Sequence, residues 1–114
     1  MIRRAWAFAR GAWWALRAVR TVRRALPTRP VHEVRAPAPP PLGRGGERGV
    51  RAVLRRLRPS CLERAIVLQR WLAARGDPRE IVIGVTAPDA RFQAHAWLEG
   101  EPPLQFQEIA RVAP

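Results

Sequence analysis

Residues 59–78 read PSCLERAIVLQRWLAARGDP and predict one helix with clear ends. Ser60 and Glu63 match a capping box, in which each side chain satisfies a free backbone N–H at the helix start. Gly76 is a good left-handed terminator, and the Asp-Pro that follows it continues the turn. Cys61 is therefore expected in the first turn of a capped helix.

Cys61 is the only cysteine of the chain, which excludes an internal disulfide framework and a Cys-rich metal site. In the first turn of a helix, the unpaired N–H groups and the helix dipole favour an anion, and the thiolate is the nucleophilic form of cysteine. The alternative interpretation is a small buried apolar residue. Since the chain has only two His, we expect no dedicated zinc site and no cofactor.

Alternating residues after this helix predict a small antiparallel sheet. Residues 80–86 place three apolar side chains on one face, and residues 91–99 alternate in the same way. Residues 104–107 predict a short third strand, and a last helical turn is expected near Ile109. Helices followed by strands predict an α+β domain with the helices on one side of the sheet.

His95 lies in the middle of the second predicted strand, between two alanines. One hypothesis makes it the general base for a cysteine on a helix packed across the sheet, because small neighbours let that helix approach. Gln93 and Trp97 share its face and would supply an amide donor and a shielding wall. The alternative is a histidine satisfied in the core or at the surface.

The first half of the chain has a different composition. The 114 residues include 21 Arg and no Lys; the part up to Arg58 holds 15 Arg and 2 acidic residues, and the rest holds 6 Arg and 7 acidic residues. Charges of +13 and −1 exclude a uniformly basic, histone-like protein and indicate a cationic arm joined to a nearly neutral domain.

We divide the chain into three segments. Residues 1–26 predict a basic amphipathic helix with three Trp, whose apolar stripe contains Met1, Ala5, Phe8, Ala12, Ala15, Val19, Val22 and Leu26. Residues 27–46 contain six Pro and predict an extended linker. Residues 47–114 form the predicted domain, which begins with a helix from about Glu47 to Leu57.

Membrane and export signals are absent from the sequence. A transmembrane helix needs about 20 apolar residues and a secretory signal an apolar core of roughly 7–15 residues, but Arg interrupts every apolar stretch near the N-terminus. We therefore expect a cytoplasmic protein, with membrane association through residues 1–26 as a further expectation.

Four sequence blocks together point to a family. They are PSCLERA at 59–65, QRWL at 69–72, IGV at 83–85 and AHAWLE at 94–99. In this order and spacing they resemble the transglutaminase-like leader peptidase of lasso peptide biosynthesis, the protease half of the bacterial B protein in its split form. A helix-capped Cys followed by a strand His is the arrangement of papain-like and transglutaminase-like cysteine proteases. The resemblance runs from about Arg48 to Val112.

The resemblance implies limited proteolysis of a ribosomally made precursor. Cys61 would attack the carbonyl group at the junction of leader and core, and His95 would take the thiol proton and deliver it to the departing amine. The implied partners are the precursor leader peptide, a separate leader-recognition protein and an ATP-dependent, asparagine-synthetase-like cyclase.

The sequence departs from the family at the third member of the triad. The family usually carries an Asp on the strand after His, which orients the imidazole, but residues 104–107 read LQFQ. Gln105 is the best substitute by position, because an amide oxygen can accept the imidazole N–H. Glu101 and Glu108 are alternatives.

Two other functions compete with the peptidase. One is a non-catalytic, transglutaminase-like binding subunit, which the missing Asp favours. The other is a nucleic-acid or anionic-membrane binder based on the +13 half of the chain. The apolar stripe on the same helix argues against nucleic acid, because docking it would enlarge a core that residues 47–114 alone make only marginal in size.

Overall fold

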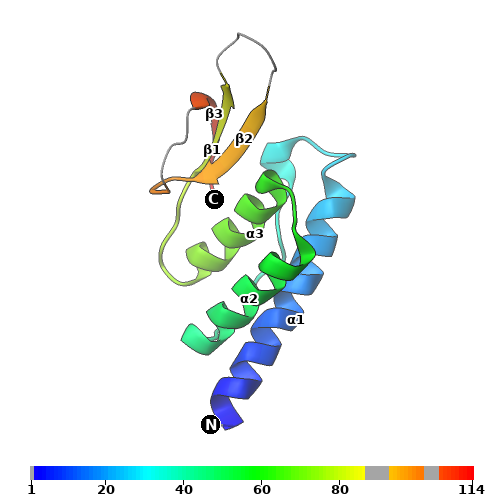
Figure 1. Cartoon of the computed structure of the whole chain (residues 1–114), viewed down its shortest axis with the longest axis vertical. Helices are drawn as coiled ribbons and strands as arrows, with labels where there is room; N and C mark the ends of the chain where they lie inside the picture. The colour runs from blue at the N-terminus through cyan, green and yellow to red at the C-terminus, as the bar shows by residue number, and fades with distance from the viewer. Residues whose placement is uncertain (1, 87–92, 102–105) are drawn as a thin grey trace.

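The computed structural model describes residues 2–86, 93–101 and 106–114. Within these residues the chain forms, in order, α1 (Ile2–Ala25), η1 (Val31–Glu33, a 3₁₀ turn), α2 (Arg44–Leu57), α3 (Cys61–Ala74), β1 (Ile81–Thr86), β2 (Ala94–Leu98) and β3 (Phe106–Val112). Figure 1 shows the helices gathered on one side of the sheet. This arrangement confirms the predicted α+β class.

Helices α1 and α2 run parallel and in close contact, and α3 returns beside them (Figure 1). Gly11 of α1 lies so near α2 that an added Cβ atom would collide with the carbonyl oxygen of Gly46. Farther along the pair, the Arg23 guanidinium donates to the carbonyl oxygen of Leu57 at 3.2 Å. The glycine that weakens α1 as an isolated helix therefore permits the contact that holds it in place.

One hydrophobic core joins the helices and the sheet. Its largest fully buried side chains are Trp71, Leu68, Ile81, Leu98, Val19, Val22, Val50 and Val67. Each such burial contributes roughly 1.5–3 kcal/mol relative to exposure. Because two of these valines belong to α1, the first helix contributes to the same core as the residues around Cys61.

The buried face of α1 agrees with the predicted stripe only in the second half of the helix. Ala15, Val19 and Val22 are buried, as expected, but Phe8 is 41% exposed and Trp14 is buried in its place. The first half of α1 lies against the glycine-containing first turn of α2, which offers backbone contact and little apolar surface.

The predicted start of the second helix at about Glu47 is wrong by three residues, since α2 begins at Arg44. Glycines in the first turn hid this start from the sequence, yet their small size lets α2 meet α1. The chain before α2 also packs onto the helices. Val34 and Ala36 are buried, and the Trp14 indole N–H donates to the carbonyl oxygen of Pro37 at 3.1 Å.

The sheet has the order β2-β1-β3, with both outer strands antiparallel to β1. Ile81 of β1 pairs with Leu98 of β2, and these two residues and Ala96 belong to the core on the helix side. Side chains alternate along a strand. Their neighbours in sequence therefore point away from the helices, onto what we call the outer face of the sheet.

Residues 106–112 form β3, so the predicted helical turn near Ile109 is wrong. Antiparallel pairing with β1 supplies the backbone hydrogen bonds that a single helical turn would leave unmade. A change of register between Ile83 and Gly84 of β1 leaves Ile109 without a partner in the ladder. Such a bulge breaks the alternation by which a strand is recognised in sequence.

Candidate active site

Cys61 is the first residue of α3, and a capping box holds the helix start in place. The Ser60 hydroxyl accepts the N–H of Glu63 at 3.1 Å, and the Glu63 carboxylate accepts the N–H of Ser60 at 2.8 Å. The same carboxylate receives a hydrogen bond from Arg23 of α1 at 3.2 Å. The remaining N–H groups of the first turn, and the positive end of the helix dipole, lie beside Cys61 and favour an anion there.

The sulfur of Cys61 reaches the edge of the sheet. Cys61 Sγ accepts the backbone N–H of Ala96, on β2, at 3.3 Å. Because β2 is an edge strand, this N–H points out of the sheet toward α3. Cys61 is half-buried and free of any disulfide. The sulfur therefore has hydrogen-bond donors on two sides, the first turn of α3 and the edge of β2.

His95 precedes Ala96 on β2, and its ring belongs to an aromatic cluster on the outer face. The imidazole stacks against Phe106 of β3, with ring centroids 4.9 Å apart, and against Trp97, at 5.9 Å. Within the described residues, the His95 ring has no hydrogen bond, to Cys61 or to any other group. The sulfur of Cys61 therefore contacts the residue next to His95, but the sulfur and the imidazole lie on different sides of β2.

Gly84 provides the room for this cluster. It pairs with His95 across the β1–β2 ladder, and a Cβ atom added to it would lie 2.7 Å from the Trp97 ring. The Trp97 indole thus covers Gly84, and the His95 imidazole stacks against the same indole. Trp97 is only 7% exposed, and its role as a shielding wall stays a prediction.

Of the three candidates for the third triad member, Gln105 lies outside the described residues. Glu101 is engaged elsewhere, because its carboxylate accepts the N–H of Leu98 at 2.9 Å and lies 3.4 Å from the Arg64 guanidinium. This arrangement caps the turn after β2 and ties it to α3. Glu101 therefore does not contact His95.

Glu108 lies in the same row of the sheet as His95, since both pair with Gly84 from opposite sides. Two strand spacings, about 10 Å, separate the two backbones. The Glu108 carboxylate accepts two hydrogen bonds from Arg111, at 2.8 and 3.0 Å, which lower its pKa from the ordinary value. Arg111 also reaches Glu99 at 2.9 Å, and its acidic partners raise its pKa.

Gln93 lies exposed just before β2. Its backbone N–H donates to the Thr86 hydroxyl at 3.1 Å, and its carbonyl oxygen accepts the N–H of Thr86 at 2.9 Å. Both contacts close the end of the β1–β2 pair. The side-chain amide of Gln93 remains open to solvent, at the end of the strand that carries His95.

Sequence reasoning missed three parts of the site: Phe106, Gly84 and the backbone N–H of Ala96. Phe106 and the N–H become neighbours of the site only through strand pairing, which no local pattern reveals. Gly84 did leave a signal, because a glycine inside a β-branched strand often marks a close approach by another group.

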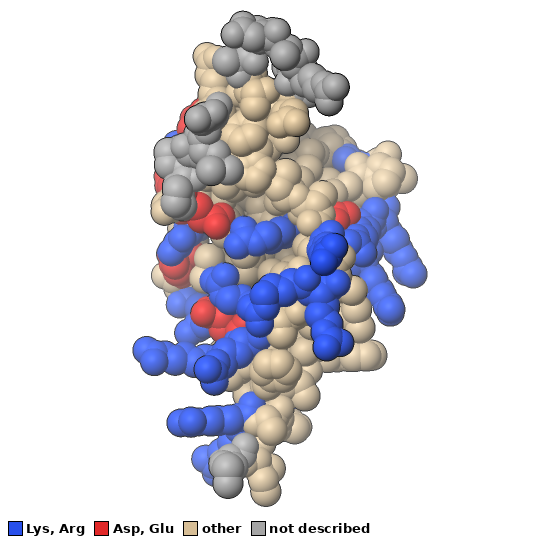
Figure 2. All heavy atoms as spheres, in the orientation of Figure 1, with Lys and Arg blue, Asp and Glu red and all other residues tan. Residues whose placement is uncertain are grey.

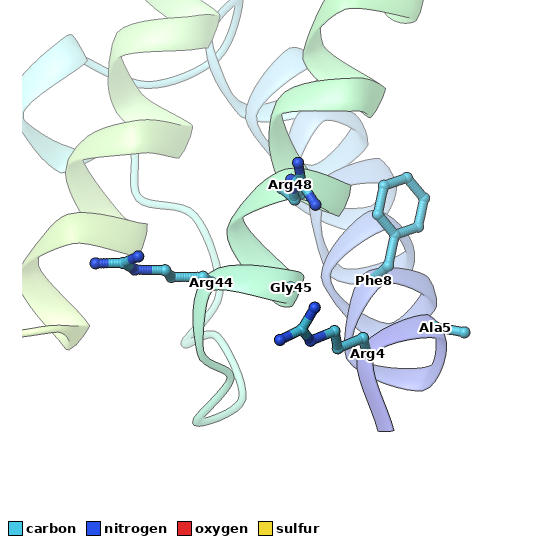
Figure 3. Close-up of a pocket in the computed structure, with 6 residues that line it drawn as sticks. All are labelled: Arg4, Ala5, Phe8, Arg44, Gly45 and Arg48. Carbon is cyan, nitrogen blue, oxygen red and sulfur yellow. The ribbon is translucent and has the colours of Figure 1, made fainter. Parts of the chain in front are cut away.

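A groove lined by arginines lies far from Cys61. A groove of about 730 Å³ runs between the first turns of α1 and α2 and is lined by Arg4, Ala5, Phe8, Arg44, Gly45 and Arg48. Figure 3 shows the three arginines around Gly45, with Phe8 beside them. None of the three guanidinium groups forms an ion pair with a described residue. The 14 residues of α2, about 21 Å, separate this arginine groove from the turn that leads to Cys61.

Among the described residues, no cluster of three or more His, Cys, Asp or Glu side chains has the grouping of a metal site. No helix in that part of the chain is both long and apolar enough to span a bilayer.

A family model described as "Transglutaminase-like superfamily" matches residues 1–112, from the start of α1 to the end of β3. No curated protein and no solved structure matches the chain. The family match thus covers Cys61, His95 and the first helix together.

Proposed function

Because the chain belongs to the transglutaminase-like superfamily, we propose that it is a cysteine peptidase that removes the leader peptide from a ribosomally made lasso peptide precursor. One observation carries the proposal. Cys61 Sγ lies at the capped start of α3 and accepts the N–H of Ala96, the residue after His95. The sequence blocks at 59–65 and 94–99, which resemble lasso leader peptidases, meet at this contact.

In the first half of the reaction, His95 takes the proton of the Cys61 thiol, and the thiolate attacks the carbonyl carbon at the end of the leader. The oxyanion that forms would lie at the start of α3, where first-turn N–H groups point toward it, and the Gln93 amide is a second donor. The C–N bond then breaks, and the imidazolium gives its proton to the departing core amine.

Proton transfer requires the His95 ring to turn from its stacked position toward the sulfur. The edge of β2 leaves a path for this rotation, because no described strand pairs with that side of β2. The stacked ring would therefore be a resting position, and the substrate would favour the turned one. Rotation of a half-buried side chain is fast compared with enzymatic turnover.

In the second half of the reaction, water attacks the thioester that joins the leader to Cys61. His95 accepts a proton from this water and returns it to the sulfur, which releases the leader as a carboxylate. The freed core amine is the group that an ATP-dependent cyclase would join to a side-chain carboxylate. The peptidase needs no cofactor for either step.

The arginine groove supports a use for the basic half of the chain. Arg4, Arg44 and Arg48, which form no ion pair with a described residue, make a cationic rim around the apolar side chain of Phe8. An acidic segment with one large apolar residue fits such a groove by charge and by burial. We assign the groove to the precursor leader or to the separate leader-recognition protein that presents it.

A second candidate function is a non-catalytic binding subunit. The observation in its favour is the position of the His95 ring, which stacks on Phe106 without a hydrogen bond to Cys61. Such a protein would bind the precursor in the arginine groove and leave it uncut. Both functions require the chain to bind the precursor, but only the peptidase cuts it.

Both functions are tested by incubating the full chain with the precursor and a separate leader-recognition protein, and by following the products by mass spectrometry. We expect one cut, and a rate at least about 10²-fold lower for Cys61→Ala and for His95→Ala. Arg55→Gln, an exposed change on α2, is the control and should cut normally. Equal cleavage by Cys61→Ala would overturn the peptidase, and binding without cleavage by the unmodified chain would establish the binding subunit.

A further inference from the structure

Helix α1 carries a second apolar face, opposite the one that packs on α2 and α3. Its residues, which we call the outer stripe, are Ile2, Trp6, Ala9, Trp13 and Leu16. At about 100° per residue they fall within an arc of roughly 80°. The buried residues Gly11, Ala15, Ala18 and Val22 lie on the other side of the helix. Ile2, Trp6, Ala9 and Trp13 are exposed, and Leu16 is half-buried beside α2, so the core leaves most of the outer stripe uncovered.

Three large side chains of the outer stripe are strongly exposed. Ile2 is 87% exposed, Trp6 59% and Trp13 62%. Soluble proteins rarely expose so many large apolar side chains on one short surface without a use for them. Among the described residues outside α1, Ile109 is the large hydrophobic residue with comparable exposure, at 61%.

The outer stripe is bordered by positive charge. Helix α1 contains no acidic residue, and Arg3, Arg10 and Arg17 recur every seven residues along one edge of the stripe. None of these three forms an ion pair with a described residue, and the Arg10 guanidinium lies 4.7 Å from the centre of the Trp6 ring. Figure 2 shows arginine side chains gathered over the helical part of the molecule, with few acidic groups among them.

We propose that the outer stripe binds the surface of an anionic lipid bilayer, with α1 parallel to the membrane plane. Tryptophan and isoleucine would enter the boundary between headgroups and acyl chains, and the bordering arginines would bind lipid phosphates. The proposal does not rest on the peptidase activity, because Cys61 and His95 take no part in it.

The shape of the stripe favours a lipid surface over a protein partner. The stripe from Ile2 to Leu16 runs about 21 Å along one helix, between a hollow toward α2 and a hollow toward residues 38–40. A protein partner would need a complementary surface to bury this line of side chains, whereas a bilayer surface accepts it directly. The same helix is too rich in arginine to cross the bilayer, so it lies on the membrane.

The proposal is tested by sedimenting the full chain with lipid vesicles. We expect it to sediment with vesicles of equal parts phosphatidylglycerol and phosphatidylcholine, and at least about tenfold less with phosphatidylcholine alone. Trp6→Ala/Trp13→Ala should reduce binding to the anionic vesicles about tenfold or more. Ile109→Ala removes a side chain of similar exposure on β3 and should leave binding unchanged.

Charge is tested by a second matched pair. Arg10→Gln/Arg17→Gln removes two positive charges beside the outer stripe and should weaken vesicle binding several-fold. Arg29→Gln/Arg55→Gln removes two charges from exposed positions elsewhere and should have a clearly smaller effect. Equal effects of the two double variants would show attraction by net charge alone and overturn the assignment to the outer stripe.

Tryptophan fluorescence identifies the residues that enter the lipid. Trp14, Trp71 and Trp97 are buried, so only Trp6 and Trp13 are free to respond to a membrane. Anionic vesicles should shift the emission to shorter wavelength, and Trp6→Phe/Trp13→Phe should bind the vesicles without this shift. No sedimentation at low salt would overturn the proposal. A second result would also overturn the proposal: the unmodified chain is a dimer in solution, Trp6→Ala/Trp13→Ala is a monomer, and neither protein binds vesicles. The outer stripe would then bind a second copy of the chain.

Discussion

The two sides of strand β2 have different surroundings. The helix side contacts Cys61 of α3, and the outer face carries His95. On the helix side, Ala96 and Leu98 pack into the core, and the N–H of Ala96 donates to Cys61 Sγ. On the outer face, His95 stacks with Trp97 and Phe106, and no described helix covers these rings. The sulfur is thus held by the core, and the imidazole by a few aromatic contacts.

This difference separates stability from catalysis within one strand. A change on the helix side should first affect folding, because Cys61 is positioned by the same packing that stabilises the domain. A change on the outer face should first affect the orientation of the imidazole, because little of the core depends on it.

The largest expected effect is the loss of stability on truncating Trp71 of α3, in the core on the helix side of the sheet. Trp97, on the outer face, is the matched comparison. Trp71 is 1% exposed on the helix side and lies 5.5 Å from Trp14. We expect Trp71→Ala to lower the free energy of unfolding by about 3–5 kcal/mol, as measured by urea denaturation. Trp97→Ala on the outer face should cost about 2 kcal/mol and reduce cleavage more than its stability loss explains. A larger stability loss for Trp97→Ala than for Trp71→Ala would remove the distinction.

The next largest effect is expected at Gly84. The Cβ atom of alanine at this position would lie 2.7 Å from the Trp97 ring and displace the indole against which His95 stacks. We expect Gly84→Ala to cost about 1–3 kcal/mol in stability and to reduce the rate of precursor cleavage.

Gly43→Ala is the control for this change, because a Cβ atom at that glycine meets nothing within 4 Å. It should leave cleavage unchanged. Normal cleavage by Gly84→Ala would show that the position of the aromatic cluster is irrelevant to the imidazole.

A smaller effect is expected at Gln105, the residue that the sequence predicts to orient His95. We expect Gln105→Ala to lower the cleavage rate about tenfold, or about 1.4 kcal/mol, while precursor binding is retained. Glu108→Gln, the matched change in the row that contains His95, should leave the rate close to normal, because Arg111 already holds that carboxylate. The opposite result would transfer the orienting role to Glu108.

The smallest effect is a pH dependence on the outer face. Arg111 lowers the pKa of Glu108 below its ordinary value of about 4.5. A carboxyl group with a lowered pKa in the folded state stabilises the protein above that value, and the contribution is lost as the pH falls. Glu108→Gln should therefore be slightly less stable than the unmodified protein at pH 7, with the difference shrinking below about pH 4.5.

Glu33→Gln is the control for the pH series. The Glu33 carboxylate lies 4.0 Å from the His32 ring and, among the described residues, accepts no pair of hydrogen bonds like the one that Arg111 donates to Glu108. Stability should be followed by thermal melting at each pH. A difference between Glu108→Gln and the unmodified chain that persisted at pH 3 would contradict the assigned origin of the effect.

Local sequence signals predicted those parts of the molecule that depend on neighbours along the chain. The capping box at Ser60 and Glu63 and the left-handed Gly76 bound α3 closely, because both act within one helical turn. The alternation around His95 located β2. Where the chain departs from local patterns, prediction failed, as at the glycine-containing start of α2 and at the bulge near Ile109.

By itself, the sequence determined the class of the fold, the place of Cys61 in the first turn of a capped helix, and the strand that carries His95. Only the tertiary structure decided which side of that strand each group occupies. Side-chain direction depends on strand register and on the helix that packs against the sheet, and both arise from contacts between residues far apart in the chain. The same packing decided that one apolar face of α1 enters the core and that most of the outer stripe stays exposed.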